Sequence, residues 1–503
     1  MRKNLKVNNI MDKFLVIFLL IQPIFDVKFF YNSISTLIRV IIIFSLTLFY
    51  FFRRSEKGKF KFLGKWQYVL LAYPILFGVY FIFHHINALN FTSLVPGNFN
   101  YSVIKEFLYF VKMFSPFLLI YCIYKSSISR DNIINIMKSL VLIITLVIVI
   151  SNLFVFSYGS YSDSIIKDNF FGWFTQNSGY TGYNYKDLAS KGLFEYGNQI
   201  GAILIMFLPF MIYLVFKECN FINCFTLFFN VFALFLLCTR VSVLGVFVVL
   251  IYTVFTFAFI YFIQKQHFSI KKFLPIGLVL IVYSTLLPIN PMFNRIDERN
   301  TVIETFRESV ADESIPSEVE TPTVVSDSRI KYIEETYEKQ KLHKQFLFEN
   351  YPYTYDPDFW YDFLHKDISL TTNYRYIEKS IIQRVVEINN NPLDKWLGIT
   401  NTRLQNIFNI ERDFVVQYYA LGIIGTILVF APYFALLSWF AYVTILNKFR
   451  NLDVVNTLAF ITIVFLLGIS YMSGNLLNSL SFTIYFTLCF DLLVKKESGT
   501  VGS

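Results

Sequence analysis

Residues 197–216 read GNQIGAILIMFLPFMIYLVF and contain no charged side chain. A helix of about 20 apolar residues covers about 30 Å, which is the thickness of the hydrocarbon core of a bilayer. The whole chain of 503 residues has a similar character, with 55% hydrophobic and only 16% charged residues. Soluble chains carry about 25% charged residues, so the sequence predicts an all-α integral membrane protein.

Eleven other apolar runs are long enough, or nearly so, to cross a membrane as helices. We therefore expect about 12 transmembrane helices. Besides the run at 197–216, they lie at residues 10–25, 34–52, 66–83, 107–124, 139–156, 224–238, 242–263, 273–289, 419–446, 454–471 and 476–494.

Lys and Arg collect in alternate connecting segments. If the N-terminus is cytoplasmic, the cytoplasmic segments hold 21 basic residues, whereas the short exported loops hold five. Cytoplasmic loops of membrane proteins are enriched in Lys and Arg, so we expect both termini in the cytoplasm. This topology accounts for the net charge of +9, and we expect no nucleic-acid partner.

The predicted topology divides the chain into three parts. Residues 1–289 hold helices one to nine with an exported loop at 157–196, and residues 413–503 hold the last three helices and a cytoplasmic tail. Between them, residues 290–412 form one large extracytoplasmic loop domain that joins helices nine and ten. This loop has 15 basic and 21 acidic residues, so the surplus positive charge belongs to the membrane part.

Within the large loop, apolar residues recur at helical spacing over residues 328–348 and 371–388, which predicts two helices. The aromatic run YPYTYDPDFWYDF at 351–363 lies between them. Tyr and Trp favour the membrane interface, so this run either lies on that interface or offers a stacking surface for a sugar or lipid. The sequence leaves both interpretations open.

The chain has no Walker loop, Rossmann fingerprint, HExxH pair or GxSxG elbow. Nucleotide-driven chemistry is therefore not expected, and any reaction should use a substrate that is already activated. The histidines His84, His85, His343 and His365 show no metal-ligand spacing. We expect neither a metal site nor a cofactor.

Arginines near the exported ends of the apolar helices are the main candidates for a functional site. Arg39 lies about five residues inside the second helix, and Arg240 lies in the tight exported turn CTRVSVLG. Arg412 stands between Glu411 and Asp413. Each has a plainer explanation as well: Arg39 and Arg240 as side chains that reach the headgroups, and Arg412 as part of a surface ion pair.

Arg375, at the start of the second predicted loop helix, is either a solvated charge or a fourth member of this group. Guanidinium groups bind phosphate oxygens bidentately, so several arginines at one membrane face predict a clamp for a lipid-linked diphosphate. The clamp would stabilise the charge that develops on the diphosphate as a sugar C1–O bond breaks. An acceptor hydroxyl needs a base; Glu411 and Asp413 are the candidates, although a carboxylate beside an arginine is a weaker base.

Six motifs occur in order along the chain: QPIFD (22–26), LIR (37–39), KGLFEYGNQIG (191–201), CTRVSVLG (238–245), NPLDKWLGIT (391–400) and IERDFVVQYYALGIIG (410–425). Together they resemble the O-antigen ligase and Wzy-type polymerase superfamily. The resemblance implies a polytopic bacterial enzyme with a large extracytoplasmic loop late in the chain. Such an enzyme transfers glycans from undecaprenyl diphosphate on the outer face of the cell membrane.

Two arginines match the arginines of the family motifs. The resemblance assigns the arginine of the family's GTR-like turn to Arg240, with Cys238 at the usual glycine. It assigns the arginine ahead of the LGIG-like segment to Arg375, with Thr400 at the last glycine.

The acidic motif ahead of YGIIG corresponds to Glu411 and Asp413, with Arg412 where an apolar residue is more usual. In SGNLLNS (473–479), Asn475 stands where related sequences often have His. Because an amide is not a base, a mechanism that depends on that His is in doubt for this chain.

The sequence and the resemblance together predict a membrane polysaccharide polymerase that moves a glycan from undecaprenyl diphosphate to a lipid-linked repeat unit. Its expected partners are undecaprenyl diphosphate-linked oligosaccharides, the lipid bilayer, a flippase and a chain-length regulator. Three alternatives stay open: a ligase that uses another acceptor, a lipid-linked glycan flippase or transporter, and a non-catalytic assembly partner. Against a transporter, no two halves of the chain read as repeats with interrupted helices.

Overall fold

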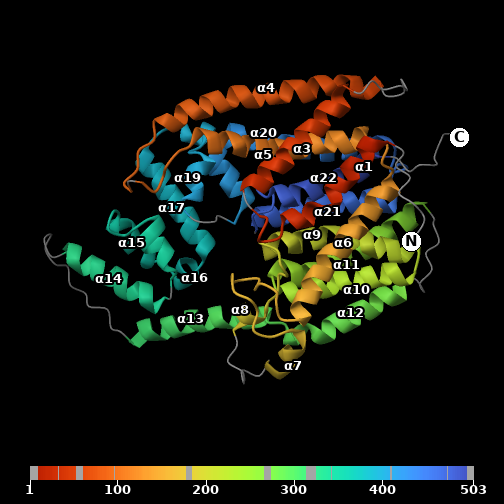
Figure 1. Cartoon of the computed structure of the whole chain (residues 1–503). Helices are drawn as coiled ribbons and strands as arrows, with labels where there is room; N and C mark the ends of the chain where they lie inside the picture. Colours follow the sequence, from red (N-terminus) through yellow and green to blue (C-terminus); the bar gives the residue numbers. More distant parts are fainter. Residues whose placement is uncertain are drawn as a thin grey trace. The chain divides into compact units, whose positions relative to one another are not determined.

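The computed structural model describes residues 9–31, 33–52, 61–95, 97–176, 184–264, 273–312, 325–340, 342–407, 411–472 and 474–495. These residues form helices, joined by loops that contain three isolated β-bridges, and they form no sheet (Figure 1). The all-helical class predicted from the sequence is confirmed in this part of the chain.

Nine segments of the described chain are long and apolar enough to cross a membrane. They are α3 (Ser33–Phe52), Ala72–Leu89 within α4 (Lys61–Leu89), α5 (Val103–Lys125), α6 (Arg130–Leu153), α9 (Gly197–Lys217), Arg240–Ile263 within α11 (Arg240–Gln264), Leu274–Glu308, α20 (Asp413–Leu446) and α21 (Val454–Met472). Two shorter apolar helices, α10 (Phe221–Leu237) and α22 (Leu480–Val494), coincide with two further predicted spans. The multi-span architecture is confirmed, whereas the total of twelve crossings stays a prediction.

The first predicted span, 10–25, is divided into α1 (Ile10–Leu20) and α2 (Gln22–Phe25). The break falls just before Pro23, which has no N–H to continue the ladder of α1 and whose ring clashes with the carbonyl four residues earlier. At 1.5 Å per residue, the 11 residues of α1 cover about 16 Å, roughly half of the hydrocarbon core.

The orientation of the termini also stays a prediction. Much of the basic charge behind it lies at residues 1–8, 53–60, 265–272 and 496–503, which are outside the described residues.

Residue contacts divide the chain into two compact units. The first comprises Met1–Lys57, Lys112–Asn294 and Ala431–Ser503, and the second comprises Gly58–Val111 and Arg295–Phe430. Contacts thus group the predicted large loop with α4 and with the beginning of α20. The two units are described separately below.

In the first unit, α9 is the central helix. It packs against α6, α10, α11, α21 and α22 (Figure 1), and most of its side chains are buried. A helix that is apolar on all sides needs partners on all sides, which explains the central place of the uncharged segment 197–216. The unit also contains α1, α2 and α3, the later parts of α5 and α20, α12 (Leu274–Leu286) and the short η3 (Leu287–Ile289).

The connection between α6 and α9 is held to the helix ends by hydrogen bonds. Its described parts contain η1 (Phe170–Gly172), α7 (Trp173–Gln176) and α8 (Tyr185–Leu188). Phe194 forms a β-bridge with Val27 beyond α2, and the Ser190 N–H donates to Leu236 O of α10 at 2.8 Å. The predicted exported loop 157–196 is therefore tied to α2 and α10; its residues 177–183 lie outside the described chain.

The second unit contains the short helices of the large loop. They are α13 (Met292–Asp312, from Arg295), α14 (Val325–Lys339), η4 (Gln345–Asn350), α15 (Pro357–Leu364), α16 (Ile368–Thr371), α17 (Tyr374–Asn389), α18 (Asp394–Leu397) and α19 (Asn401–Gln405). Of the two predicted loop helices, 371–388 corresponds closely to α17, whereas 328–348 is represented by α14, which ends at Lys339, and by the separate η4.

The aromatic run 351–363 forms part of a core in the second unit. Tyr351, Trp360 and Phe363 are each at most 1% exposed. The Trp360 Nε1–H donates to Tyr351 O at 2.8 Å, and the Tyr351 hydroxyl donates to Asp356 at 2.7 Å. These three rings are unavailable as a stacking surface, because they pack against each other and their neighbours.

Candidate functional site

Arg375 and Glu411 form a half-exposed ion pair in the second unit. Arg375 lies in the first turn of α17, and Glu411 lies two residues before α20. Nε and Nη2 of Arg375 donate to Oε2 of Glu411 at 3.0 and 2.6 Å, and the two side chains are 34% and 38% exposed. An ion pair in contact with water contributes at most about 1 kcal/mol to the stability of the fold. An anion that carries more negative charge than a carboxylate can therefore replace Glu411 on the guanidinium group.

Glu378 lies one helical turn after Arg375 and is only 2% exposed. The backbone N–H of Glu411 hydrogen-bonds to its carboxyl group, whereas Oε2 has no hydrogen-bond partner among the described residues. Burial, and then the negative charge of Glu411, raise the pKa of Glu378 to about 8 despite the nearby Arg375 and Arg412. Glu378 therefore carries a proton at neutral pH.

Arg412 and Asp413 follow Glu411 at the beginning of α20. Arg412 is half-buried, and its Nε has no hydrogen-bond partner in the described part of the chain. Asp413, the first residue of α20, is completely buried. Of the two predicted bases, Glu411 is thus the one that a substrate can reach without rearrangement.

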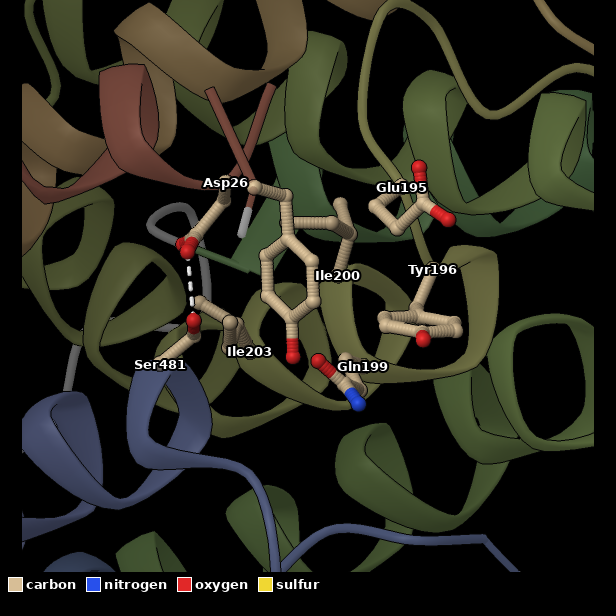
Figure 2. A pocket seen from close by; sticks show the side chains of 8 residues that line it. Asp26, Glu195, Tyr196, Gln199, Ile200, Ile203 and Ser481 are labelled. Atoms are coloured by element: carbon tan, nitrogen blue, oxygen red, sulfur yellow. Dashed lines mark hydrogen bonds between the residues drawn. The ribbon is translucent and has the colours of Figure 1, made fainter. Parts of the chain in front are cut away.

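Arg39, in the first unit, is buried in a polar cluster with Asp26 and Ser481. Its Nη2 donates to Oδ1 of Asp26 at 2.8 Å, and its Nη1 donates to Oγ of Ser481 at 2.6 Å. Ser481 in turn donates to Asp26 (Figure 2). Arg39 is 1% exposed, so its charge is neutralised inside the protein rather than presented to a ligand.

Arg240 is the first residue of α11 and is exposed. The turn before it is rigid, because the Thr239 N–H donates to Oγ of Ser242 and the Ser242 N–H donates to Oγ1 of Thr239, both at 3.1 Å. Cys238 ends α10 in the left-handed conformation with φ of 55°. This backbone suits glycine better, which is the residue that the family motif usually has at this position.

Glu106 is a buried carboxylate that sequence reasoning did not single out. It accepts hydrogen bonds from the backbone N–H groups of Asn401 and Thr402, both at 2.9 Å, and from the Thr402 hydroxyl. His84 Nε2 lies 3.2 Å from the same carboxylate. Glu106 thus caps the first turn of α19, and these hydrogen bonds position residues 401–403.

Arg403, also in α19, likewise holds this helix in position. Its guanidinium group donates to the carbonyl oxygens of Phe99, Ile399 and Ala88 at 3.2, 3.2 and 2.8 Å. Burial lowers its pKa to about 10. These contacts make Arg403 a structural residue, in contrast to the half-exposed Arg375.

A family model described as O-antigen ligase like membrane protein matches residues 8–497 of the chain. The chain belongs to this family. A comparison with curated proteins found no match. Membership of the O-antigen ligase like family confirms the predicted resemblance and indicates a transferase that acts at the membrane.

Two motifs of this O-antigen ligase like protein cross each other at close range. In the second unit, the Ile399 N–H donates to Tyr419 O at 2.8 Å, and the Thr400 N–H donates to Ala420 O at 3.0 Å. Gly398 and Gly422 both have positive φ, 78° and 63°. A Cβ at either position would overlap backbone atoms of the other segment, so LGIT and ALGIIG require their glycines for this approach.

Thr400 stands at the position to which the resemblance assigns the last glycine of the motif. Its φ of 86° is in a region that favours glycine, so the chain carries backbone strain there. The Thr400 hydroxyl accepts a hydrogen bond from the Arg403 N–H at 3.4 Å, which compensates for part of this cost.

Asn475 lies beside α9 in the first unit. Gln199 Nε2 is 3.5 Å from Asn475 O, and the Ser479 hydroxyl donates to Gln199 Oε1 at 2.8 Å. Asn475 therefore contributes a backbone contact in this family member, and its side chain offers no base.

The predicted site residues fall in both units. Arg39 and Arg240 belong to the first unit, and Arg375, Glu411, Arg412 and Asp413 belong to the second. Within the second unit, the structure brings Arg375 and Glu411 into contact and adds Glu378. The sequence indicates the burial of Glu378 only by its position, on the face of α17 that also carries Ile381, Ile382 and Val385. In the described chain, no group of three or more His, Cys, Asp or Glu is arranged to hold a metal ion.

Proposed function

We propose that this protein is a polysaccharide polymerase of the outer face of the bacterial cell membrane. It transfers a growing glycan from undecaprenyl diphosphate to a lipid-linked repeat unit, in the synthesis of a capsule, an O-antigen-like chain or a wall polysaccharide. Its donor and acceptor are both diphosphate-linked lipids.

The half-exposed pair of Arg375 and Glu411, with Arg412 and the protonated Glu378, carries this proposal. Arg375 and Arg412 supply two positive charges, and Glu378 adds no negative charge because it is neutral at pH 7. A diphosphate has more charge than a carboxylate and matches the fork of the guanidinium group. It can therefore displace Glu411 from Arg375 and gain a second cation in Arg412.

The same displacement supplies the base. Glu411, released from Arg375, accepts the proton of the acceptor hydroxyl while the acceptor oxygen forms a bond to C1 of the donor sugar. The bond between C1 and the phosphate oxygen breaks, and undecaprenyl diphosphate leaves with its charge held by Arg375 and Arg412. Glu378, which is buried, keeps its proton and so adds no negative charge against the diphosphate. Asp413 stays a second candidate for the base.

Arg240 and Arg39 have different roles in this proposal. In the first unit, Arg240 is an exposed guanidinium group with the chemistry to bind a phosphate, and an enzyme whose two substrates both carry a diphosphate has a use for it. Arg39 is a positioning residue, because its charge is already paired with Asp26.

The proposal is tested by replacing the chromosomal gene, in cells that make the polysaccharide, with Arg375→Ala, Arg375→Lys and the control Lys379→Ala. Lys379 lies on the same helix, and no ion pair to it is found among the described residues. Loss of a diphosphate ligand should reduce transfer about 100-fold or more. Arg375→Ala should then lack long polymer and accumulate single lipid-linked repeats, Arg375→Lys should give short chains, and Lys379→Ala should match the wild type.

The outcomes separate the alternatives. Long polymer at normal yield from an Arg375→Ala protein that is present in the membrane would refute the polymerase. Finished polymer that stays on its lipid carrier would indicate the ligase. Repeat units retained on the cytoplasmic side would indicate the flippase or transporter.

A further inference from the structure

Lys191 begins the KGLFEYGNQIG motif, and its side chain is almost enclosed in the first unit. The residue is 5% exposed. Its Nζ lies 3.7 Å from Oδ1 of Asp163, which is beyond hydrogen-bond length, and it has no closer ionic partner within the described chain. Burial lowers the pKa of Lys191 although Asp163 and Glu195 lie nearby. A nearly buried ammonium group without a close partner costs free energy, so this position favours a further anion.

Lys28 binds the same carboxylate oxygen. Its Nζ donates to Oδ1 of Asp163 at 2.8 Å and lies 4.7 Å from the centre of the Tyr158 ring. Asp163 thus serves two ammonium groups with one oxygen, while its side chain is 78% exposed. An ion pair so open to water is weak. An anion with more charge and more oxygens than a carboxylate can therefore displace Asp163 and pair with both lysines.

Backbone hydrogen bonds hold the two lysines in place. The Lys28 N–H donates to Leu193 O at 2.9 Å, so the segment after α2 is tied to the segment that begins with Lys191. The Lys191 N–H donates to Tyr158 O at 2.9 Å, and the Tyr158 N–H donates to Gly192 O at 2.8 Å. These bonds fix the backbone around both cations before a ligand binds, which lowers the entropy cost of binding.

Exposed apolar side chains flank Lys28 in the sequence. Phe29 and Phe30 follow it directly, Ile24 precedes it on α2, and all three are more than half exposed. Lys28 lies just beyond the first predicted span, 10–25, where apolar side chains contact acyl chains and a lysine reaches the headgroups. A molecule with both a phosphate and a hydrocarbon tail matches these two features together.

Other ligand classes match less well. The two ammonium groups repel a metal cation, and a neutral sugar leaves their charge unpaired. A carboxylate ligand gains nothing over Asp163, which is already part of the chain. Free phosphate pairs with the lysines but makes no use of the exposed Phe29 and Phe30.

We infer that Lys28 and Lys191 bind the phosphate group of a membrane lipid, which displaces Asp163 from both. Lysine binds phosphate as a point charge. Two kinds of lipid offer this chemistry: the diphosphate-linked carrier of a substrate, and an anionic phospholipid of the bilayer. The first choice rests on the proposed function, in which both substrates are diphosphate-linked lipids, whereas binding of a lipid phosphate does not.

The test uses native mass spectrometry of the full-length protein in detergent, which resolves each lipid-bound species and gives its Kd. The probes are undecaprenyl diphosphate, phosphatidylglycerol and the zwitterionic phosphatidylcholine. Every variant is made in an Arg375→Ala background, so that binding at Arg375 does not contribute.

The variants change the charge of the site in both directions. Lys191→Met and Lys28→Met should each weaken binding of the preferred anionic probe about 5- to 10-fold, and Lys191→Arg should retain it. Asp163→Asn should tighten binding about 2- to 5-fold, because the competing carboxylate is gone. An unchanged Kd in Lys191→Met, or weaker binding in Asp163→Asn, would overturn the inference.

A matched Lys–Asp pair lies at the opposite end of α9. Lys217 Nζ donates to Oδ1 of Asp131 at 3.0 Å, and both side chains are exposed. Lys217→Met and Asp131→Asn should leave Kd unchanged. Phosphatidylcholine that binds as tightly as the anionic probes, or inorganic pyrophosphate that displaces them at equal concentration, would also contradict a site for a lipid phosphate.

The source of the phosphate and the proposed function are judged separately. A lysine-dependent preference for undecaprenyl diphosphate supports the substrate carrier, and equal lysine-dependent binding of phosphatidylglycerol supports a bilayer phospholipid; either result supports the site. Normal polymer from Arg375→Ala would refute the polymerase and leave this site intact. Binding that does not depend on the lysines would refute this site alone.

Discussion

The protonated Glu378 predicts how the stability of this protein depends on pH. Its pKa is about 8 in the folded chain against an ordinary value of 4.5. Below pH 4.5 the carboxyl group is protonated in both the folded and the unfolded state. Between 4.5 and 8 it ionises only in the unfolded state, so the free energy of unfolding falls as the pH rises, and above 8 no further loss occurs.

The magnitude follows from the same values. Each pH unit corresponds to about 1.4 kcal/mol, so the loss between pH 4.5 and 8 reaches about 5 kcal/mol as an upper bound. Glu378→Gln resembles the neutral acid and removes this loss. The variant should match the wild type near pH 5 and be the more stable protein at pH 8.

The assay is thermal unfolding of the full-length protein in detergent, followed by intrinsic fluorescence from pH 5 to 8.5. Glu387→Gln is the matched control, because Glu387 lies on the same helix and its side chain is 68% exposed. Its unfolding temperature should follow that of the wild type at every pH. A difference between Glu378→Gln and the wild type that does not grow with pH would refute the reasoning.

Three substitutions test the packing of the second unit by the same unfolding measurement at pH 7. Thr400→Gly should stabilise the protein by about 1 kcal/mol, since relief of the positive φ outweighs the weak cap and the added chain entropy; a lower unfolding temperature would contradict this. Gly422→Ala should destabilise it by about 3 kcal/mol or more, because the new Cβ overlaps the backbone of Trp396; wild-type stability would show that the segments can separate. Glu106→Gln should cost about 3 kcal/mol, because one amide oxygen replaces a carboxylate with several donors; a loss below 1 kcal/mol would show that these donors find other partners.

The helices were predictable because burial in a bilayer is a local property of the sequence. Residues 197–216 read as a span by composition alone, and α9 occupies nearly the same residues. The aromatic run 351–363 was ambiguous for the opposite reason. Its composition suits an interface, a ligand platform or a core equally well, and only the packing of Trp360 against its neighbours distinguishes them.

The site was partly predictable. Arg240 was singled out because arginines near exported helix ends stand out against the rule that places basic residues in the cytoplasm, and Arg375 because it begins a predicted loop helix and matches a family motif. Their partners were not predictable, because Arg375 meets Glu411 across 36 residues and Glu106 meets Asn401 across 295. Glu378 was missed because a glutamate in an acidic loop is ordinary until its burial is known.

The partners of the arginines decide which of them can act on a substrate. From the sequence alone, every arginine looks available to bind an anion. In the structure, Arg39 is paired with a carboxylate that is 5% exposed. The guanidinium group of Arg403 is surrounded by backbone carbonyl oxygens. Removing Asp26 from Arg39 would leave a buried charge unpaired, which costs several kcal/mol. The pair of Arg375 and Glu411 is more than a third exposed on its acidic side, so Glu411 can leave at small cost and be solvated. A weak ion pair in contact with water is thus a better candidate for a diphosphate site than a strong buried ion pair. Its carboxylate, once displaced, is available as the base.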